Sequence, residues 1–308
     1  MKNDIVNDSI DVILPIYKEP VELVKNSVSS ILCQEMVDVR LILILDNPQY
    51  EGIDYINELS KLNNVLVIFN EENLGLPLSL NIGIEHSNRK FIARMDADDI
   101  SEPTRLFNQL KYLKENKVDL IGCSVYKIDI KGSVIGKMPA IDKKLMNIDV
   151  LRYKTIMYHP TWFGKASVFK EIKYRNFKYA QDVDFLNRAL KQGYRLDNCH
   201  DYLLKFRTHN GKDIDFEKIY KQFLYRKLAY LSNTKSDINI DKELWNINVV
   251  KSSQRFRLAI KMFFLSINSR FVLLKISALI IGFLLHNYVR EQVIFKIKSF
   301  FISYFYEK

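Results

Sequence analysis

The sequence has 308 residues, of which 48% are hydrophobic and 27% are charged, and this composition excludes a chain that is disordered along most of its length. Ten glycines and seven prolines are few for this length, which disfavours collagen-like, linker-rich and many-turned all-β proteins. A net charge of +10 favours an anionic partner such as a phosphate compound, a nucleic acid or a lipid surface.

The first residues do not have the composition of a secretory signal. Asp4, Asp8 and Asp11 stand where such a signal carries a positive charge and then an apolar run. The three cysteines are odd in number and far apart, so they predict neither a disulfide framework nor a local CxxC metal site. We therefore expect a cytoplasmic protein.

Short apolar runs alternate with helical patterns through the first part of the chain. The runs predict strands over 12–17, 40–45, 65–70 and 91–96, and the patterns predict helices over 21–32, 53–62 and 77–85. This alternation is typical of an α/β fold with a mostly parallel central sheet flanked by helices. Such sheets bind ligands at the carboxyl ends of their strands, so we expect the polar residues that end these strands to meet there.

No glycine lies between Pro15 and the helix predicted after it. The sequence therefore has neither a GxGxxG dinucleotide turn nor a GxxxxGK[ST] phosphate loop at this place, which disfavours dehydrogenases and P-loop proteins. The same absence weakens the case for a sugar nucleotidyltransferase. A nucleotide would then have to bind through its base and a metal ion.

An acidic cluster follows the last of these strands. Asp96 and Asp98 are two residues apart, so an extended chain presents both on one side, and Asp99 follows them. Such carboxylates bind Mg²⁺ or Mn²⁺ and leave positions open for diphosphate oxygens. The alternative is that Asp98, Asp99 or Ser101 caps the next helix. Capping explains one carboxylate but not the mutual repulsion of three, so we favour the metal site.

Three stretches of the chain, VILPIYKEP, ENLGLPLSLNIGI and FIARMDADDISEPTRL, resemble a family-2 glycosyltransferase with the GT-A fold, over about residues 10–210. The resemblance implies an inverting enzyme of bacterial capsule or O-antigen synthesis that moves a sugar from a UDP-sugar to an acceptor hydroxyl. It implies a donor-binding set that consists of Pro15, Tyr17, Glu19, Asp46, Asn73, Arg94, Asp96 and Asp98. Of these, Asp96 and Asp98 would also hold the metal ion. Asn47 departs from the pattern, because the family commonly has a second Asp there.

By the same resemblance, the candidate catalytic base is Asp182, which opens a helical pattern that runs to Gly193. Gln181 replaces the usual Glu, which removes a negative charge beside the base. The alternative is that Asp182 caps the helix and that Asp184 favours its first turn. With the resemblance we prefer the base, and Asp184 is the fallback.

Two further segments carry candidate residues. His159 precedes a strand-like stretch over 162–169; either it orients a substrate or it is structural, and Trp162 is either a core residue or a platform under a sugar ring. Arg207 and His209 share one face of an extended segment. The resemblance implies that Arg207 meets the diphosphate and that His209 completes the metal shell, whereas the alternative is a solvated loop.

The carboxyl-terminal part concentrates the positive charge. From Lys251 onward there are ten basic and two acidic residues, so eight of the ten net charges lie there, among many Phe, Ile and Leu. This composition favours a basic helix that lies on a membrane surface, and it makes a nucleic-acid partner less consistent with the sequence. The longest apolar run, 276–285, is half of the ~20 residues that a spanning helix needs. The alternative is that these helices pack on the main domain or on a second subunit.

We therefore predict a GT-A domain over 1–212, with a nucleotide-sugar half over 1–100 and an acceptor half over 101–212, and a helical membrane-associating region over 213–308. The protein would use Mn²⁺ or Mg²⁺ and act on a polyprenyl-diphosphate-linked glycan at the inner face of the cell membrane. A non-catalytic nucleotide- or glycan-binding protein and a membrane-peripheral assembly factor are the rivals, and a nucleotidyltransferase ranks last. We expect no nucleic-acid partner, and the sequence leaves the oligomeric state open.

Overall fold

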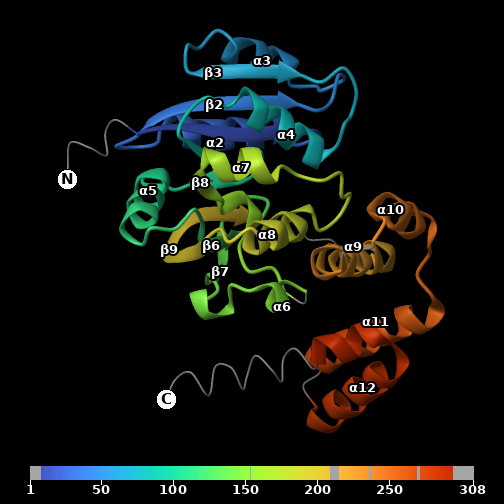
Figure 1. Ribbon diagram of the computed structural model, residues 1–308. Helices are drawn as coiled ribbons and strands as arrows, with labels where there is room; N and C mark the ends of the chain where they lie inside the picture. The colour runs from blue at the N-terminus through green and yellow to red at the C-terminus, as the bar shows by residue number, and fades with distance from the viewer. Residues whose placement is uncertain (1–7, 153, 209–214, 236–237, 269–270, 294–308) are drawn as a thin grey trace. The chain divides into compact units, whose positions relative to one another are not determined.

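The computed structural model in Figure 1 describes residues 8–152, 154–208, 215–235, 238–268 and 271–293. The chain divides into two units, of which the first consists of Met1–Ile148 and Thr155–Asn210 and the second of Asp149–Lys154 and Gly211–Lys308. In the described residues the first unit contains all the strands, and the second is helical.

The described strands of the first unit form one sheet in the order β3-β2-β1-β4-β8-β6-β9-β5, with β7 paired to β6. The strands are β1 (Ser9–Ile16), β2 (Asp38–Leu45), β3 (Val65–Phe69), β4 (Phe91–Arg94), β5 (Ile100–Ser101), β6 (Leu120–Ile128), β7 (Val134–Met138), β8 (Phe163–Lys165) and β9 (Leu196–Arg207). β1 to β4, β6 and β9 run in one direction, and β5, β7 and β8 run against them. The predicted α/β fold with a mostly parallel central sheet is confirmed.

Helices flank this sheet (Figure 1). They are α2 (Val21–Leu32), α3 (Ile53–Leu59), α4 (Leu76–His86), α5 (Arg105–Glu115), α7 (Ala166–Ile172) and α8 (Gln181–Lys191), and the short turns η1 (Lys143–Leu145), α6 (Ile148–Leu151) and η2 (His159–Thr161) join other elements. α2 has the bounds that the apolar pattern predicts, and α3 ends three residues earlier than predicted.

The central strand β1 and its neighbours β2 and β3 end at paired residues. All its residues after Ser9 are buried, as expected for a strand covered on both faces. Ile16 pairs with Leu45 at the end of β2, and Leu45 pairs with Phe69 at the end of β3. The chain therefore leaves these strands at one edge of the sheet.

The predicted strand over 162–169 is wrong beyond its first residues. β8 ends at Lys165 and α7 begins at the next residue. Val168, Phe169 and Ile172 are all buried, and this spacing matches the period of a helix better than that of a strand. The sequence reading missed the change of period because β8 is only three residues long.

The second unit contains α9 (Phe216–Thr234), α10 (Ile240–Val249), α11 (Gln254–Asn268) and α12 (Val272–Leu285). Asp215 caps α9 by accepting a hydrogen bond from the Lys218 backbone N–H (2.9 Å), and Asn239 caps α10 in the same way. Among the residues that the structure describes, no helix combines the length and the apolar character that a membrane crossing requires.

The close approach of α4 to β1 and β2 depends on Gly83, where a Cβ would lie 2.5 Å from Ile13 Cγ2 and 3.0 Å from Ile44 Cδ1. Gly83→Val is expected to lower the free energy of unfolding by about 2 kcal/mol, because overpacking a core costs ~1–3 kcal/mol. Urea denaturation measures it. The control is Gly136→Val in β7, where a Cβ would meet only Lys127, at 3.9 Å. Equal effects of the two substitutions would contradict the prediction.

Candidate active site

A cavity of about 280 Å³ lies where the parallel strands end. Its lining consists of Pro15, Ile16, Tyr17, Glu19, Asp46, Asn73, Gly75, Leu76 and Asp96. These residues end or follow β1, β2, β3 and β4, so the topology of the sheet explains why they meet. Six residues of the predicted donor-binding set therefore line one cavity.

Asp46, directly after β2, supports one wall of this cavity. Its buried carboxylate accepts hydrogen bonds from Asn70 Nδ2 (2.7 Å) and from the backbone N–H groups of Leu74 (2.8 Å) and Gly75 (2.9 Å). Gly75 has a φ of +83°, a conformation that glycine adopts without strain. These contacts give Asp46 a structural function in the loop after β3, and its contact with uridine stays a prediction.

The turn after β1 forms a second wall. The Glu19 carboxylate accepts hydrogen bonds from two backbone N–H groups, one of them that of Tyr17 (2.7 Å). Asn47 Nδ2 donates to the Tyr17 carbonyl (2.9 Å), so the residue that departs from the family pattern ties this turn to β2. Burial raises the pKa of Glu19, the backbone hydrogen bonds oppose the rise, and the charges of Asp98 and Asp96 add to it.

The acidic cluster follows β4. Asp96, Asp98 and Asp99 each place a carboxylate oxygen within 4.8 Å of the others. Asp99 is 1% exposed, and its Oδ2 has no hydrogen-bond partner among the described residues. Burial raises the pKa of Asp96 and, more strongly, that of Asp99, and repulsion from the neighbouring carboxylates raises both further. Hard oxygen ligands that repel each other, one of them unpaired, fit Mg²⁺ or Mn²⁺.

Arg94, the last residue of β4, lies beside this cluster. It is 3% exposed and forms an ion pair with Asp96. Its Nε and Nη1 are buried, and neither has a hydrogen-bond partner in the part of the chain that the structure describes. A buried cationic donor without an acceptor is costly. Arg94 therefore has two buried donors that an anionic or strongly accepting group of a ligand would satisfy.

Arg105, a residue that sequence reasoning did not single out, supports Arg94 from α5. It is fully buried; its Nη2 donates to the Arg94 carbonyl (2.8 Å) and its Nη1 to the Pro160 carbonyl (3.3 Å). Burial lowers the pKa of Arg105 to about 10, so the side chain stays charged at neutral pH. Its only sequence signal is its place on the buried face of a helix.

Arg207, at the end of β9, bonds the acidic turn. Its buried guanidinium donates to the carbonyls of Asp98 (Nε, 2.7 Å), Asp129 (Nη1, 2.8 Å) and Ile130 (Nη1, 3.0 Å). Its backbone N–H donates to Asp99 Oδ1 (2.7 Å). Arg207 therefore ties the acidic turn to the turn between β6 and β7 through its Nε and Nη1, and its contact with a diphosphate stays a prediction.

The structure separates the two acids at the start of α8. Asp182 is partly exposed, whereas Asp184 is fully buried and pairs with two arginines, Arg175 (Nε, 3.0 Å) and Arg188 (Nε, 3.0 Å). Ala180 begins the helix with a φ of +55°, which is rare for alanine. Its ion pairs give Asp184 a structural function, so Asp182 remains the candidate base.

His159, in η2, belongs to a buried aromatic cluster. Its Nε2 lies 2.8 Å from the Tyr174 hydroxyl, and its ring centroid lies 4.5 Å from that of Trp162. Trp162 is fully buried, so it is a core residue and not a platform for a sugar. Burial lowers the pKa of His159 well below its usual value, and the charge of Arg94 adds to this, which keeps the imidazole neutral at neutral pH.

Tyr174 belongs to the same aromatic cluster as His159 and Trp162. Burial raises the pKa of its phenol, and the negative charges of Asp182 and Asp96 act in the same direction. The Asn81 side chain in α4 bonds both its backbone N–H and its carbonyl (2.8 Å each). The sequence analysis did not identify Tyr174. His209, the predicted third metal ligand, lies outside the described residues.

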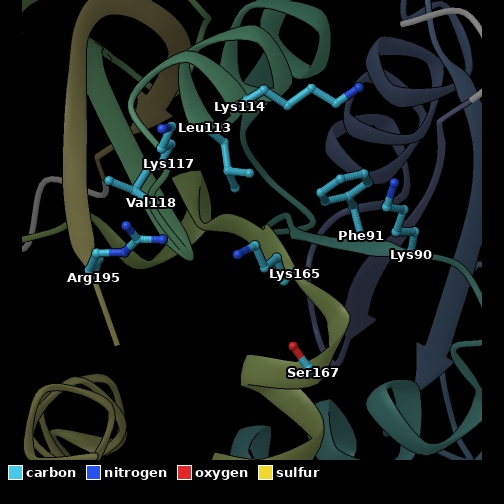
Figure 2. Close-up of a pocket in the computed structure, with 9 residues that line it drawn as sticks. All are labelled: Lys90, Phe91, Leu113, Lys114, Lys117, Val118, Lys165, Ser167 and Arg195. Atoms are coloured by element: carbon cyan, nitrogen blue, oxygen red, sulfur yellow. The ribbon is translucent and has the colours of Figure 1, made fainter. Parts of the chain in front are cut away.

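A larger cavity, of about 620 Å³, lies at the other ends of the strands, where β4, β6 and β9 begin (Figure 2). Its lining consists of Lys90, Phe91, Leu113, Lys114, Lys117, Val118, Lys165, Ser167 and Arg195. Four of its five cationic side chains form ion pairs with Asp8 or Asp119. No residue predicted for donor binding or catalysis lines it, so we call it the cationic cavity and separate it from the candidate site.

A family model described as "Glycosyl transferase family 2" matches residues 11–173. Over 221 residues the chain is 34% identical to the uncharacterized glycosyltransferase MJ1057 of Methanocaldococcus jannaschii, which covers 70% of this chain and 76% of that protein. Over 207 residues it is 30% identical to the O-antigen biosynthesis glycosyltransferase WbnJ of Escherichia coli, covering 66% and 81%. The amylovoran biosynthesis glycosyltransferase AmsE of Erwinia amylovora is 28% identical over 211 residues, covering 66% and 77%.

Among solved structures, the fold is similar to that of S. aureus TarS, residues 1–349, in complex with UDP-GlcNAc. The TM-score is 0.59, and the match covers 92% of this chain and 83% of that chain at 16% sequence identity. At this identity the likeness shows the fold alone, which is the GT-A arrangement of sheet and helices.

Asp99→Asn is expected to stabilise the metal-free protein, because it removes a buried charge while its side-chain oxygen still accepts the Arg207 N–H. A raised pKa means that the folded state binds the proton more tightly, so wild type loses stability as pH rises from about 4 through the raised value. The gain over wild type should therefore grow with pH in urea denaturation with chelator. Asp201→Asn, at an exposed carboxylate, is the control. A gain that does not change with pH would contradict the prediction.

Proposed function

The chain belongs to glycosyl transferase family 2, and we propose that it is an inverting enzyme that transfers a sugar from a UDP-sugar to an acceptor hydroxyl. The observation that carries this proposal is the cluster of Asp96, Asp98 and Asp99 beside a cavity in whose wall Asp96 takes part. A carboxylate cluster next to a cavity is what binding of a metal-diphosphate group requires.

The donor would occupy the cavity at the carboxyl ends of the strands. We assign Pro15, Tyr17, Glu19 and Asp46 to the uridine, since all four line it, and Asn73 lines the same cavity from the loop after β3. Support for a UDP-sugar comes from the similar fold of TarS, which was solved with UDP-GlcNAc. The identity of the sugar is not part of the proposal.

Asp96 and Asp98 would hold Mn²⁺ or Mg²⁺, with the unpaired oxygen of Asp99 behind them. When bound, such an ion neutralises charge on the leaving diphosphate. The unpaired Nε and Nη1 of Arg94 would donate to phosphate oxygens, which stabilises the same charge through hydrogen bonds. His209 stays a predicted third ligand.

Asp182 is the proposed catalytic base. The acceptor oxygen attacks the anomeric carbon, the bond from that carbon to the diphosphate oxygen breaks, and its electron pair leaves with UDP. The hydroxyl proton moves to the Asp182 carboxylate, which releases it to solvent before the next turnover. The support for this choice is that Asp182 is partly exposed, whereas the neighbouring Asp184 is fully buried and paired with Arg175 and Arg188.

We further propose that the acceptor is a polyprenyl-diphosphate-linked glycan at the inner, cytoplasmic face of the cell membrane. Relatives named for O-antigen and amylovoran biosynthesis support a surface polysaccharide as the product. In this assignment residues 1–212 transfer the sugar, with the donor on 1–100 and the acceptor on 101–212. Residues 213–308 hold the enzyme at the membrane.

Asp182→Asn is expected to lower kcat by about 10²–10⁴-fold, because the base supplies that much in general-base catalysis, while the Kd for UDP changes less than about twofold. The assay measures UDP release and glycan product with a panel of UDP-sugars and the full chain. Asp54→Asn is the matched control, since Asp54 is an exposed acid in the first turn of α3. More than half of the wild-type rate in Asp182→Asn would sink the assignment.

Asp98→Ala is expected to weaken UDP binding at least about tenfold with Mn²⁺ and not at all with chelator, because the lost ligand acts only through the metal. Thermal denaturation measures it, since UDP at 100 times its Kd adds about 2.7 kcal/mol to the stability of wild type. Asp201→Ala, at an exposed carboxylate of β9, should behave as wild type. UDP binding that is the same with and without metal would argue against the metal site. No UDP binding at all would argue against the donor.

A further inference from the structure

α12 packs against α11 through small residues of its own. On α12 the buried positions are Ala278 and Gly282, four residues apart on one face. A Cβ at Gly282 would lie 3.2 Å from the Ala259 carbonyl of α11, so glycine permits a very close approach of the two backbones. α11 buries Phe256 and Ile260 together with Ala259, so the small residues are those of α12, and their spacing of four also occurs in helices that associate in lipid.

The large apolar side chains of α12 point away from this contact. Leu273, Ile276, Ile280 and Leu284 are 84%, 52%, 54% and 66% exposed. Their spacing of three, four and four residues places them on one face of the helix. A helix surrounded by water buries its large apolar face, so the arrangement in α12 is the inverse of the usual one. Exposed apolar surface that is continuous in this way marks a binding surface.

The charges around the α11–α12 pair indicate what kind of partner binds its exposed apolar surface. No acidic residue occurs between Glu243 and Glu291, whereas seven basic residues do. Lys261 in α11 and Lys275 in α12 are both exposed, and their long stems let the ammonium groups reach a polar layer above an apolar one. A second copy would bring the same cations against these, which costs energy. Anionic lipid head groups would instead pair with them.

The length of the helices decides between crossing a bilayer and lying on it. α12 has 14 residues, which at 1.5 Å per residue reach about 21 Å, less than the ~30 Å hydrocarbon core. Val272, Leu274 and Ile281 on the other sides of α12 are exposed as well, and Lys275 is exposed among them. A helix of this length and composition fits within one leaflet, with its cation at the polar boundary.

We propose that the α11–α12 pair is an in-plane membrane anchor. The face formed by Leu273, Ile276, Ile280 and Leu284 lies among the acyl chains of one leaflet, and Lys261 and Lys275 lie at the level of the phosphate groups of anionic phospholipids. This proposal depends on the proposed function in one respect: a lipid-linked acceptor would explain why the enzyme is held at a membrane. The binding of the α11–α12 pair to lipid can be tested independently of the sugar transfer.

The main test is flotation of the full chain with vesicles of phosphatidylcholine plus phosphatidylglycerol, and with vesicles of phosphatidylcholine alone. The double variant Leu273→Asp, Ile280→Asp should lower the partition coefficient by about a hundredfold or more, because two large side chains no longer enter the hydrocarbon. The control is Leu62→Asp, at an exposed leucine of the first unit, which should bind as wild type. Wild-type binding by the double variant would overturn the proposal.

A second pair of variants tests the source of the charge effect. Lys275→Gln should lower the partition into anionic vesicles about fivefold, since one cation near such a surface contributes about 1 kcal/mol. The cationic cavity of the first unit is the rival surface, and Lys117 forms no ion pair within the described residues (Figure 2). Lys117→Gln should therefore leave the partition unchanged. A lower partition of Lys117→Gln together with an unchanged partition of Lys275→Gln would show that the cationic cavity binds the lipid, and would overturn the proposal.

Depth and self-association are measured separately. Leu273→Trp should be quenched by phosphatidylcholine brominated in its acyl chains, and Leu62→Trp should not be; equal quenching would overturn the proposal. Sedimentation without lipid tests the second copy. A wild-type dimer that becomes monomeric in Leu273→Asp, Ile280→Asp, together with no vesicle binding, would show that a second chain covers this face. UDP binding with Mn²⁺, measured on the same variants, should stay as in wild type, so a failed anchor and a failed donor site remain distinguishable.

Discussion

Three carboxylates at the end of one buried strand are the constraint on which the rest of the site depends. Asp96, Asp98 and Asp99 lie close enough to repel one another, with Asp99 buried and the other two partly exposed, and burial raises the pKa of the first and the third. Arg94 neutralises only part of this charge through Asp96. One oxygen of Asp99 is left without a partner among the described residues, so the fold holds a partly unsatisfied cluster in place at the edge of a cavity. Such an arrangement favours a bound cation.

The structure divides the polar residues of this region into supports and reactive groups. Asp46 and Asp184 are buried, and neighbours donate hydrogen bonds to both oxygens of each carboxylate, as is usual for structural polar groups. Arg94 and Asp99 are equally buried, yet each keeps atoms without partners. An unsatisfied buried group is costly, and a ligand at the edge of the cavity would supply the partners that these atoms of Arg94 and Asp99 lack.

Two glycines show that the two units solve different packing problems. Gly83 lets α4 approach a sheet whose large side chains, Ile13 and Ile44, are buried around it. Gly282 likewise permits a close helix contact beside the buried Val289, but Leu273, Ile280 and Leu284 of the same helix face outward. The first arrangement is the one that the hydrophobic effect selects in water, whereas the second is the one that packing selects in lipid. Glycine therefore permits close packing both where the large apolar side chains are buried, as around Gly83, and where they are exposed, as on α12.

Local patterns in the sequence determined the elements and the acidic cluster. The periodicity of apolar residues correctly predicted the bounds of α2, because that feature depends on residues that are near in sequence. The alternation of strands and helices correctly predicted that β1 to β4 end at one edge of the sheet. Only the tertiary structure decided which groups are available for chemistry. Asp182 and Asp184 share one turn of α8, and the pairing of Asp184 with Arg175 and Arg188 separates them. Arg207 bonds Asp99 across 108 residues, and no local pattern encodes a partner at that distance.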